Sequence, residues 1–284
     1  MKKLYSLFFW IICLFFIVAC FDEHNIKNHK GETINISQRE KHESYHRKNV
    51  GEEVPDDRFT RDQILSEILG YDVQFWVQTP KDYAGNENYP TLYVTDGQGY
   101  KKEGRLADIA DELIAEEKIN PVIIIYVDPR DPNDLSNNRR NAQFLCNPAY
   151  VEFYKEELIP YIDRNYRTDA SQKTRGILGL SFGGLNAMYF GIHAHDVFGK
   201  VGIQSPAPHP CPDIYDEYAY RERLPIDVFL STGTKKDKET ATRKFKKILK
   251  RKGYDFGYME LPEGHNWKNW TPQLDDVLLR FYGK

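Results

Sequence analysis

Short apolar segments alternate with longer amphipathic ones along most of this chain. Residues 71–77 alternate between polar and apolar side chains, a pattern typical of a half-buried antiparallel strand. Residues 91–95 and 122–127 are continuous apolar runs, as in the central strands of a parallel sheet. Four further strands are predicted, at residues 176–180, 201–204, 228–231 and 256–261.

Helices are predicted between these strands. Residues 106–117 and 150–166 each carry apolar side chains at helical spacing on one face. Two closing helices are expected at residues 239–252 and 274–281. This order of elements predicts a doubly wound, mostly parallel α/β sheet with helices on both faces.

The first part of the chain lacks this alternation. Lys2 and Lys3 precede residues 4–19, which are uncharged, rich in Phe, Ile and Leu, and shorter than the roughly 20 residues of a membrane-spanning helix. We therefore expect an export signal. The run ends in Val18-Ala19-Cys20, which resembles the lipobox of bacterial lipoproteins. That resemblance implies lipidation of Cys20 and a lipoprotein anchored in the bacterial cell envelope, on its periplasmic or surface side. An uncleaved anchor helix and ordinary secretory cleavage are the alternatives.

These patterns divide the chain into a signal peptide at 1–19, a polar tether at 20–53 and an α/β domain at 54–284. The tether is charged and poor in aliphatic residues, so it cannot bury enough apolar surface to fold alone and is expected to be disordered. Its four histidines have no recognisable metal-site spacing. No metal or organic cofactor is expected.

The composition of the chain excludes some classes of binding partner. The formal net charge of −3 and the lack of a glycine-rich phosphate-binding motif argue against nucleic-acid or nucleotide partners. Of the four cysteines, only Cys146 and Cys211 belong to the predicted domain. An exported protein could join them in a disulfide or keep them as two free thiols.

The stretch Gly179-Leu180-Ser181-Phe182-Gly183-Gly184 lies between a predicted strand and a predicted helix. A serine at the apex of such a turn, within G-x-S-x-G, forms the nucleophile elbow of an α/β-hydrolase. Its flanking glycines leave room for the tight crossing of strand and helix. We therefore predict that Ser181 is a nucleophile; the alternative is a serine that only caps the helix.

A serine nucleophile needs a base, and in this fold the partners follow in the order serine, acid, histidine. His265 directly follows the last predicted strand and is the predicted base; the alternative is a histidine that only packs against Trp267. His193 and His195 end the elbow's own helix and point away from the serine. His209 follows a strand and is at best adjacent to the substrate.

The acid is expected after the penultimate strand, where Asp237 is the first choice and Glu239 the reserve. Both also lie where a helix begins, a place that favours carboxylates in any protein. The oxyanion needs two N–H donors. The predicted donors are the backbone N–H of Phe182, directly after the nucleophile, and that of Gln98, with Gly97 as the reserve.

Several distant segments carry a family resemblance: Tyr89–Gln98 (Y-P-x-L-Y-x-x-D-G-Q), Val127–Arg130 with Arg140–Phe144, Glu157–Asp163, and Glu263–Trp267 with Trp270. They resemble the Putative esterase family, which groups enterochelin esterases with esterase D, feruloyl esterases and mycolyltransferases. The resemblance spans about residues 70–284 and implies an α/β-hydrolase fold, a triad of Ser181, Asp237 and His265, and an oxyanion hole of Phe182 and Gln98. Gln143 departs from the family, which usually has Glu there.

The variable loops are expected to select the substrate. Arg130, Arg139 and Arg140 could form a cationic rim. Tyr215, Tyr218 and Tyr220 lie in the loop after Ser205. The candidate substrate-binding residues are Arg130, Arg140 and Trp267. Arginines beside aromatic rings would suit an anionic aromatic acyl group such as a catecholate or hydroxycinnamate. A salt-bridged or solvated loop explains the same residues.

These features together predict a serine hydrolase of carboxylic esters outside the cytoplasm, similar to enterochelin esterases. Its expected partners are a small-molecule or glycan-linked ester and, through Cys20, a membrane. A carbohydrate esterase that removes acetyl or feruloyl groups is one alternative, and an acyltransferase is another. A non-catalytic surface-binding lipoprotein is the alternative from a different class, because a fold alone does not establish activity.

Overall fold

The computed structural model of the chain describes residues 25–27, 33–35, 58–83 and 87–284. The predicted signal, Cys20 and most of the predicted tether lie outside the described residues. Within the tether, β1 (Asn25–Lys27) and β2 (Thr33–Asn35) pair as antiparallel strands. None of the helices among the described residues combines the length and apolar character needed to cross a bilayer.

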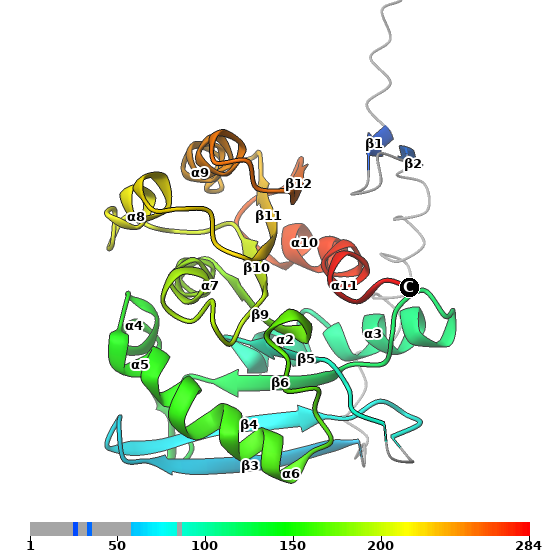
Figure 1. Cartoon of the computed structure of the whole chain (residues 1–284), viewed down its shortest axis with the longest axis vertical. Helices are drawn as coiled ribbons and strands as arrows, with labels where there is room; N and C mark the ends of the chain where they lie inside the picture. Colours follow the sequence, from blue (N-terminus) through cyan, green and yellow to red (C-terminus); the bar gives the residue numbers. More distant parts are fainter. Residues whose placement is uncertain (1–24, 28–32, 36–57, 84–86) are drawn as a thin grey trace, which may run out of the picture.

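An eight-stranded sheet forms the centre of the domain, in the order β12-β11-β10-β9-β5-β6-β4-β3 (Figure 1). From β12 to β6 all neighbours are parallel, whereas β4 pairs antiparallel with both β6 and β3. The predicted doubly wound α/β fold is therefore confirmed. The strands are β3 (Phe59–Ser66), β4 (Tyr71–Gln78), β5 (Thr91–Val94), β6 (Ile123–Asp128), β9 (Arg175–Leu180), β10 (Lys200–Gln204), β11 (Asp227–Gly233) and β12 (Phe256–Leu261).

Helices cover both faces of the sheet and bury one apolar cluster on each side. One face carries α4 (Arg140–Phe144), α5 (Pro148–Phe153), α6 (Ile159–Asn165), α7 (Phe182–His193), α8 (Ile214–Tyr220) and α9 (Glu239–Arg251). The other carries α2 (Gly97–Lys102), α3 (Leu106–Ala115), α10 (Trp267–Trp270) and α11 (Leu274–Tyr282). Two short 3-10 turns, η2 (Gln172–Thr174) and η3 (Thr271–Gln273), and a hairpin of β7 (Arg130–Asp131) and β8 (Asp134–Asn138) complete the domain.

The helix predicted at 150–166 is divided into α5, a π-helical turn η1 (Tyr154–Leu158) and α6. Pro160 lies in the first turn of α6, and its nitrogen has no hydrogen to donate to the carbonyl four residues earlier. The wider turn before Pro160 accommodates this missing bond. The apolar side chains Tyr150, Tyr154 and Leu158 still face the core.

An edge strand and several short helices were not predicted from the sequence. Strand β3 is an edge strand with polar residues in succession, so it shows no apolar alternation. Helices α2, α4 and α8 have only six, five and seven residues, too few to show a clear helical period. One of them, α2, follows the carboxyl end of β5 and faces the candidate site.

Candidate active site

The turn between β9 and α7 holds Ser181 in a conformation that few residues adopt, with φ 56° and ψ −117°. Its N–H donates to the carbonyl of Gln204 at 2.9 Å, which fixes the turn against the neighbouring strand. A Cβ on Gly179 would lie 2.1 Å from the carbonyl oxygen of Gly183, and one on Gly183 would lie 2.5 Å from Oγ1 of Thr95. Only glycine therefore fits at these two positions. The Ser181 side chain makes no capping hydrogen bond to α7, contrary to the alternative in which it only caps the helix.

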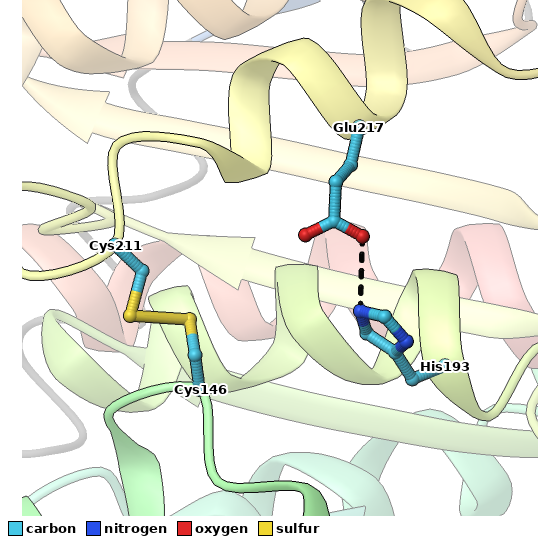
Figure 2. Close-up of a disulfide and its surroundings, with 4 residues drawn as sticks. All are labelled: Cys146, His193, Cys211 and Glu217. Atoms are coloured by element: carbon cyan, nitrogen blue, oxygen red, sulfur yellow. Dashed lines mark ion pairs between the residues drawn. A yellow bond between two sulfur atoms is a disulfide. The ribbon is translucent and has the colours of Figure 1, made fainter.

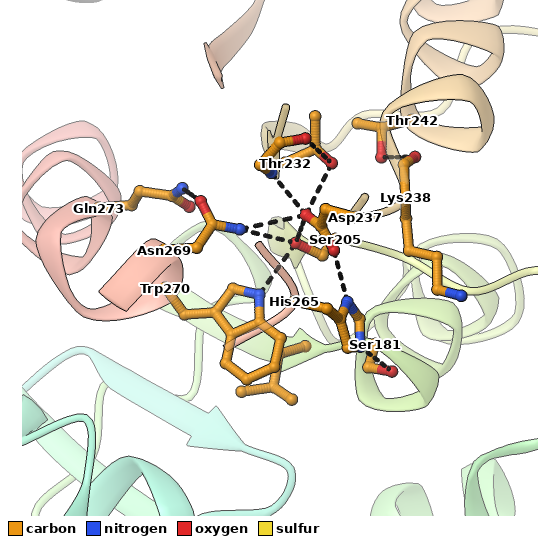
Figure 3. Close-up of polar contacts among 12 residues, drawn as sticks. Ser181, Ser205, Thr232, Asp237, Lys238, Thr242, His265, Asn269, Trp270 and Gln273 are labelled. Atoms are coloured by element: carbon orange, nitrogen blue, oxygen red, sulfur yellow. Dashed lines mark hydrogen bonds and ion pairs between the residues drawn. The ribbon is translucent and has the colours of Figure 1, made fainter. Parts of the chain in front are cut away.

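His265 reaches Ser181 from the loop after β12. Its Nε2 lies 2.9 Å from the Ser181 Oγ, and its Nδ1 lies 2.5 Å from Oδ1 of Asp237 (Figure 3). The imidazole packs edge-on against Trp270, with ring centroids 4.9 Å apart, and its side chain is 31% exposed. A base that bonds both the hydroxyl and the carboxylate, with one edge open to solvent, can move a proton to and from a bound substrate.

The other histidines lie elsewhere. His193 pairs with Glu217 at 3.0 Å near the end of α7 (Figure 2). The exposed His209 ring lies against that of Phe182, 5.4 Å between centroids. Glu239, the reserve acid, is the first residue of α9, and among the described contacts it makes no hydrogen bond to His265.

Asp237 is buried and accepts hydrogen bonds on both carboxylate oxygens. Burial alone would raise the pKa of its carboxyl, but the hydrogen bonds, led by that from His265, outweigh this effect and lower the pKa to about 2. The group is therefore an anion at any pH at which the protein would work. Its Oδ2 accepts from Ser205 Oγ (2.6 Å), Thr232 Oγ1 (2.9 Å), Gly233 N (2.5 Å) and Asn269 Nδ2 (3.1 Å) (Figure 3).

A buried network of polar side chains continues from Asp237 away from His265. Ser205 Oγ accepts from Trp270 Nε1 at 2.9 Å and from Asn269 Nδ2 at 3.2 Å. Asn269 Oδ1 accepts from Gln273 Nε2 at 2.7 Å, one helical turn later. The network then extends through Gln204, whose Nε2 donates to Gln273 Oε1 at 3.1 Å. These residues were not predicted from the sequence; the spacing of Asn269 and Gln273 by four was the one available signal.

The predicted oxyanion donors lie at the starts of two helices. Phe182 is the first residue of α7 and Gln98 the second of α2, and neither N–H has an acceptor among the described residues. The N–H and the hydroxyl of Thr95 both donate to the carbonyl of Leu178, at 3.0 and 3.3 Å, which holds the loop after β5 beside β9. First-turn N–H groups are available to an anionic ligand.

The candidate substrate-binding arginines all face carboxylates of this chain. Arg130 forms a two-pronged pair with the buried Asp128, with Nη2–Oδ2 2.7 Å. Arg140 pairs in the same way with Asp96, with Nε–Oδ1 2.6 Å and Nη2–Oδ2 2.7 Å. Arg139 forms an ion pair with Asp131. Each of these charges is thus paired within the chain, as in the salt-bridged loop that was the alternative to a cationic rim.

Of the aromatic candidates, Trp267 lies against α2 and the three tyrosines lie on α8. Trp267 packs over α2, where a Cβ on Gly99 would lie 2.8 Å from its ring, and its ring meets Tyr100 edge-on with 5.4 Å between centroids. It is partly buried and adjoins the loop that holds Gln98. Tyr218 is fully buried and donates to the carbonyl of Met188. Tyr220 is 84% exposed.

Cys146 and Cys211 form a disulfide (Figure 2). The bond joins the segment after α4 to the loop after β10, which also contains Ser205 and His209. Of the two possibilities left open by the sequence, the structure has the disulfide. Within the described part of the chain, no three His, Cys, Asp or Glu side chains are grouped so that they could hold a metal ion.

The profile of the Putative esterase family matches residues 66–281. An endo-1,4-beta-xylanase/feruloyl esterase of Xylanibacter ruminicola is 29% identical over 200 residues, which is 67% of this chain and 26% of that protein. The iron(III) enterobactin esterase of Escherichia coli is 25% identical over 140 residues, 49% of this chain and 34% of that protein. The chain thus spans only a quarter to a third of these two relatives.

A solved structure has the same fold at low sequence identity. The crystal structure of the enterobactin esterase from Shigella flexneri matches with a TM-score of 0.70 and 20% identity, covering 81% of this chain and 59% of that one. The family profile covers about three quarters of the chain and includes all three of Ser181, Asp237 and His265. The chain belongs to the Putative esterase family and is a carboxylic ester hydrolase with an α/β-hydrolase fold.

Proposed function

We propose that this protein cleaves carboxylic esters through a catalytic triad of Ser181, His265 and Asp237 and a covalent acyl-enzyme. The observation that carries the proposal is the continuous hydrogen-bond chain from the Ser181 Oγ through both nitrogens of His265 to the buried Asp237 carboxylate. A serine hydroxyl is a weak nucleophile, and this arrangement is the one that activates it.

In the first half of the reaction, the Ser181 Oγ attacks the ester carbonyl carbon while His265 Nε2 takes the hydroxyl proton. Asp237 orients the imidazole through Nδ1–H and stabilises its charged form. The N–H groups of Phe182 and Gln98 bind the oxyanion. Collapse of the tetrahedral intermediate breaks the carbon–oxygen bond to the alcohol, which leaves with the proton from His265.

In the second half, a water molecule takes the place of the alcohol. His265 removes its proton as the oxygen attacks the acyl carbon, and collapse of the second tetrahedral intermediate releases the acid. The proton returns to Ser181. An acceptor alcohol in place of water would turn the same intermediate into an acyl transfer.

For the substrate, we propose an ester like that of the enterochelin esterases. The support is the match to the enterobactin esterases in sequence and fold. A feruloyl or acetyl ester on a carbohydrate is the second candidate, favoured by the Xylanibacter relative, which aligns with two thirds of this chain. The Phe182 and His209 rings beside the nucleophile would suit an aromatic acyl group in either case.

We further propose that the enzyme acts outside the cytoplasm, lipidated at Cys20. The support is the apolar run ending at Cys20, together with the disulfide between Cys146 and Cys211. Disulfides persist in oxidising compartments and are rare in the cytosol. Incorporation of labelled palmitate by the native chain and not by Cys20→Ser is the expected result; equal labelling of both would exclude Cys20 as the site.

Hydrolysis rates on a panel of esters test the activity and the substrate together. The panel contains p-nitrophenyl acetate, methyl ferulate, acetylated xylan and a ferric catecholate trilactone, each with Ser181→Ala as the control. Serine-dependent turnover of the trilactone far above that of the acetate is expected. Preference for ferulate or xylan would select the second candidate. No serine-dependent turnover on any ester, and no labelling by a fluorophosphonate, would overturn the proposed mechanism.

A further inference from the structure

Arg140, considered above for its matched charge, contacts both loops that carry the proposed oxyanion donors. Its guanidinium donates two hydrogen bonds to Asp96, at 2.6 and 2.7 Å, and one of 3.3 Å to the carbonyl of Leu180. Asp96 stands two residues before Gln98, and Leu180 stands two residues before Phe182. One side chain therefore links the backbone just ahead of each donor.

The Asp96 side of this link controls where α2 begins. Asp96 has φ 55°, outside the usual range for a residue with a side chain, and its carbonyl accepts from Gly99 N at 2.8 Å and Tyr100 N at 3.2 Å. Its carboxylate does not cap α2 but faces Arg140 instead. Burial raises the pKa of Asp96, and the bonds from Arg140 oppose that rise. The ion pair thus stabilises both the charge and the unusual backbone of the first donor loop.

The other side of the link fixes the elbow. The Arg140 guanidinium carbon lies 5.5 Å from the centre of the Phe182 ring and 5.3 Å from that of Phe144. A Cβ on Gly183 would lie 3.2 Å from Oδ2 of Asp96, so the carboxylate packs directly against the start of α7. The guanidinium contacts both rings and would lose these contacts if it shifted toward solvent.

We propose that Arg140 is a positioning residue that sets the separation between the Gln98 and Phe182 N–H groups. The inference rests on the proposed function, in which these two groups bind the oxyanion. Donors aimed at the oxyanion act only if they are held in place before the reaction, and a displacement of about 1 Å can lower the rate about 100-fold.

This role makes a different prediction from direct binding of an anionic substrate. If Arg140 binds a substrate carboxylate, its loss should raise KM for anionic esters and leave neutral esters unaffected. If Arg140 positions the donors, its loss should lower kcat by the same factor for both. The affinity for a trifluoromethyl ketone, which forms a tetrahedral adduct with the serine, should then fall in parallel with kcat/KM.

A matched control lies at the other end of β9, the strand whose last residue, Leu180, accepts a hydrogen bond from Arg140. Arg175, the first residue of β9, is more deeply buried than Arg140: its side chain is 3% exposed against 21%. It donates to Asp163 at 2.9 Å and to the carbonyl of Val197 at 3.2 Å. It thus makes the same kinds of contact as Arg140, far from the proposed donors. Arg175→Gln should lower the melting temperature while kcat and the inhibition constant of the ketone remain within about threefold of the native values.

The experiment compares native protein, Arg140→Gln, Arg140→Lys and Arg175→Gln on p-nitrophenyl acetate and p-nitrophenyl hemisuccinate, with melting temperatures recorded for each. We expect Arg140→Gln to lose about 10- to 100-fold in kcat on both esters and in affinity for the ketone, with KM little changed. Arg140→Lys keeps the charge but not the two-pronged geometry, so its kcat and its affinity for the ketone should lie between those of the native protein and Arg140→Gln.

Two outcomes would overturn the inference while the proposed function stands: a loss confined to KM for the hemisuccinate, or equal losses in Arg140→Gln and Arg175→Gln. If Arg140→Gln does not fold, the same comparison is made with Arg140→Lys, and native kcat with native ketone affinity in that variant would count against the inference. Absence of serine-dependent turnover in the native protein would instead remove the proposed function itself.

Discussion

The hydroxyl of Ser205 donates a 2.6 Å hydrogen bond to Oδ2 of Asp237, on the opposite side of the carboxylate from His265. Ser205 follows β10 and Asp237 follows β11, so the bond joins the ends of two neighbouring strands. Ser205 is fully buried and has φ 43°. The Asp237 carboxylate is thereby fixed through Oδ2, and its Oδ1 faces the His265 imidazole.

Ser205→Ala should weaken this support. The change removes one donor to Asp237 and leaves the buried indole N–H of Trp270 without its acceptor, a loss of about 1–3 kcal/mol in the free energy of unfolding. A reduction of kcat is expected as well. Urea unfolding and ester kinetics measure the two effects. Ser231→Ala is the matched control, because the buried Ser231 hydroxyl has no hydrogen-bond partner among the described residues and its loss should cost almost nothing.

Asp237→Asn should lower kcat by about 10⁴-fold. An amide NH2 group in place of Oδ1 can donate to His265 Nδ1, which favours the imidazole tautomer whose Nε2 carries a proton and cannot accept one from Ser181. Steady-state kinetics measure the loss. Glu239→Gln should remain close to the native rate, and if it were the more damaging of the two, the acid would have been assigned to the wrong residue.

Stability should depend on the ionisation of Asp237 in acid. Its pKa is lowered from 3.8 to about 2, so the folded state favours the anion relative to the unfolded state. The resulting stabilisation, about 2 kcal/mol, is complete above about pH 5 and is lost as the pH falls through 2. Urea unfolding of native protein and Asp237→Asn from pH 6 to 2 checks this: the difference between them should shrink by that amount. A constant difference would contradict the lowered pKa.

The backbone conformation of Ser181 should lower the free energy of unfolding of the protein. A residue with φ 56° and ψ −117° carries backbone strain that glycine does not. Ser181→Gly and Ser181→Ala should both be inactive, but the glycine variant should be the more stable by about 1 kcal/mol or more. Denaturant unfolding of the pair measures the difference. Equal stabilities would mean that the elbow is not strained.

Reduction of the Cys146–Cys211 disulfide should destabilise the fold without disabling the site. The bond closes a loop of 65 residues, and the entropy of that closure corresponds to about 4 kcal/mol in the unfolded chain. Melting in the presence and absence of dithiothreitol measures the effect, and the Cys146→Ser/Cys211→Ser variant should show no further response. Below its melting temperature this variant should still hydrolyse ester, since neither cysteine takes part in the hydrogen bonds among Ser181, His265 and Asp237.

The local pattern of the chain was enough to predict the central strands, the longer helices and the elbow at Ser181. The strands at 91–95 and 176–180 are continuous apolar runs, and such runs can only be buried in the middle of a sheet. His265 and Asp237 could be selected because the order of strands specifies which loops meet at the carboxyl edge. The division of the helix at 150–166 was missed, because Pro160 acts on hydrogen bonds that an apolar period does not report.

Contacts between distant residues required the folded chain. Ser205 and Asp237 lie 32 residues apart, Asn269 lies 64 residues from Ser205, and Arg140 lies 44 residues from Asp96. No periodicity or motif pairs such residues, so the arginine that suggested a substrate contact in the sequence proves to be matched to a buried carboxylate. Periodicity reports which side of an element is buried, whereas the partner of a buried charge depends on how separate elements pack. The former can be read along the chain, and the latter exists only once the sheet has assembled.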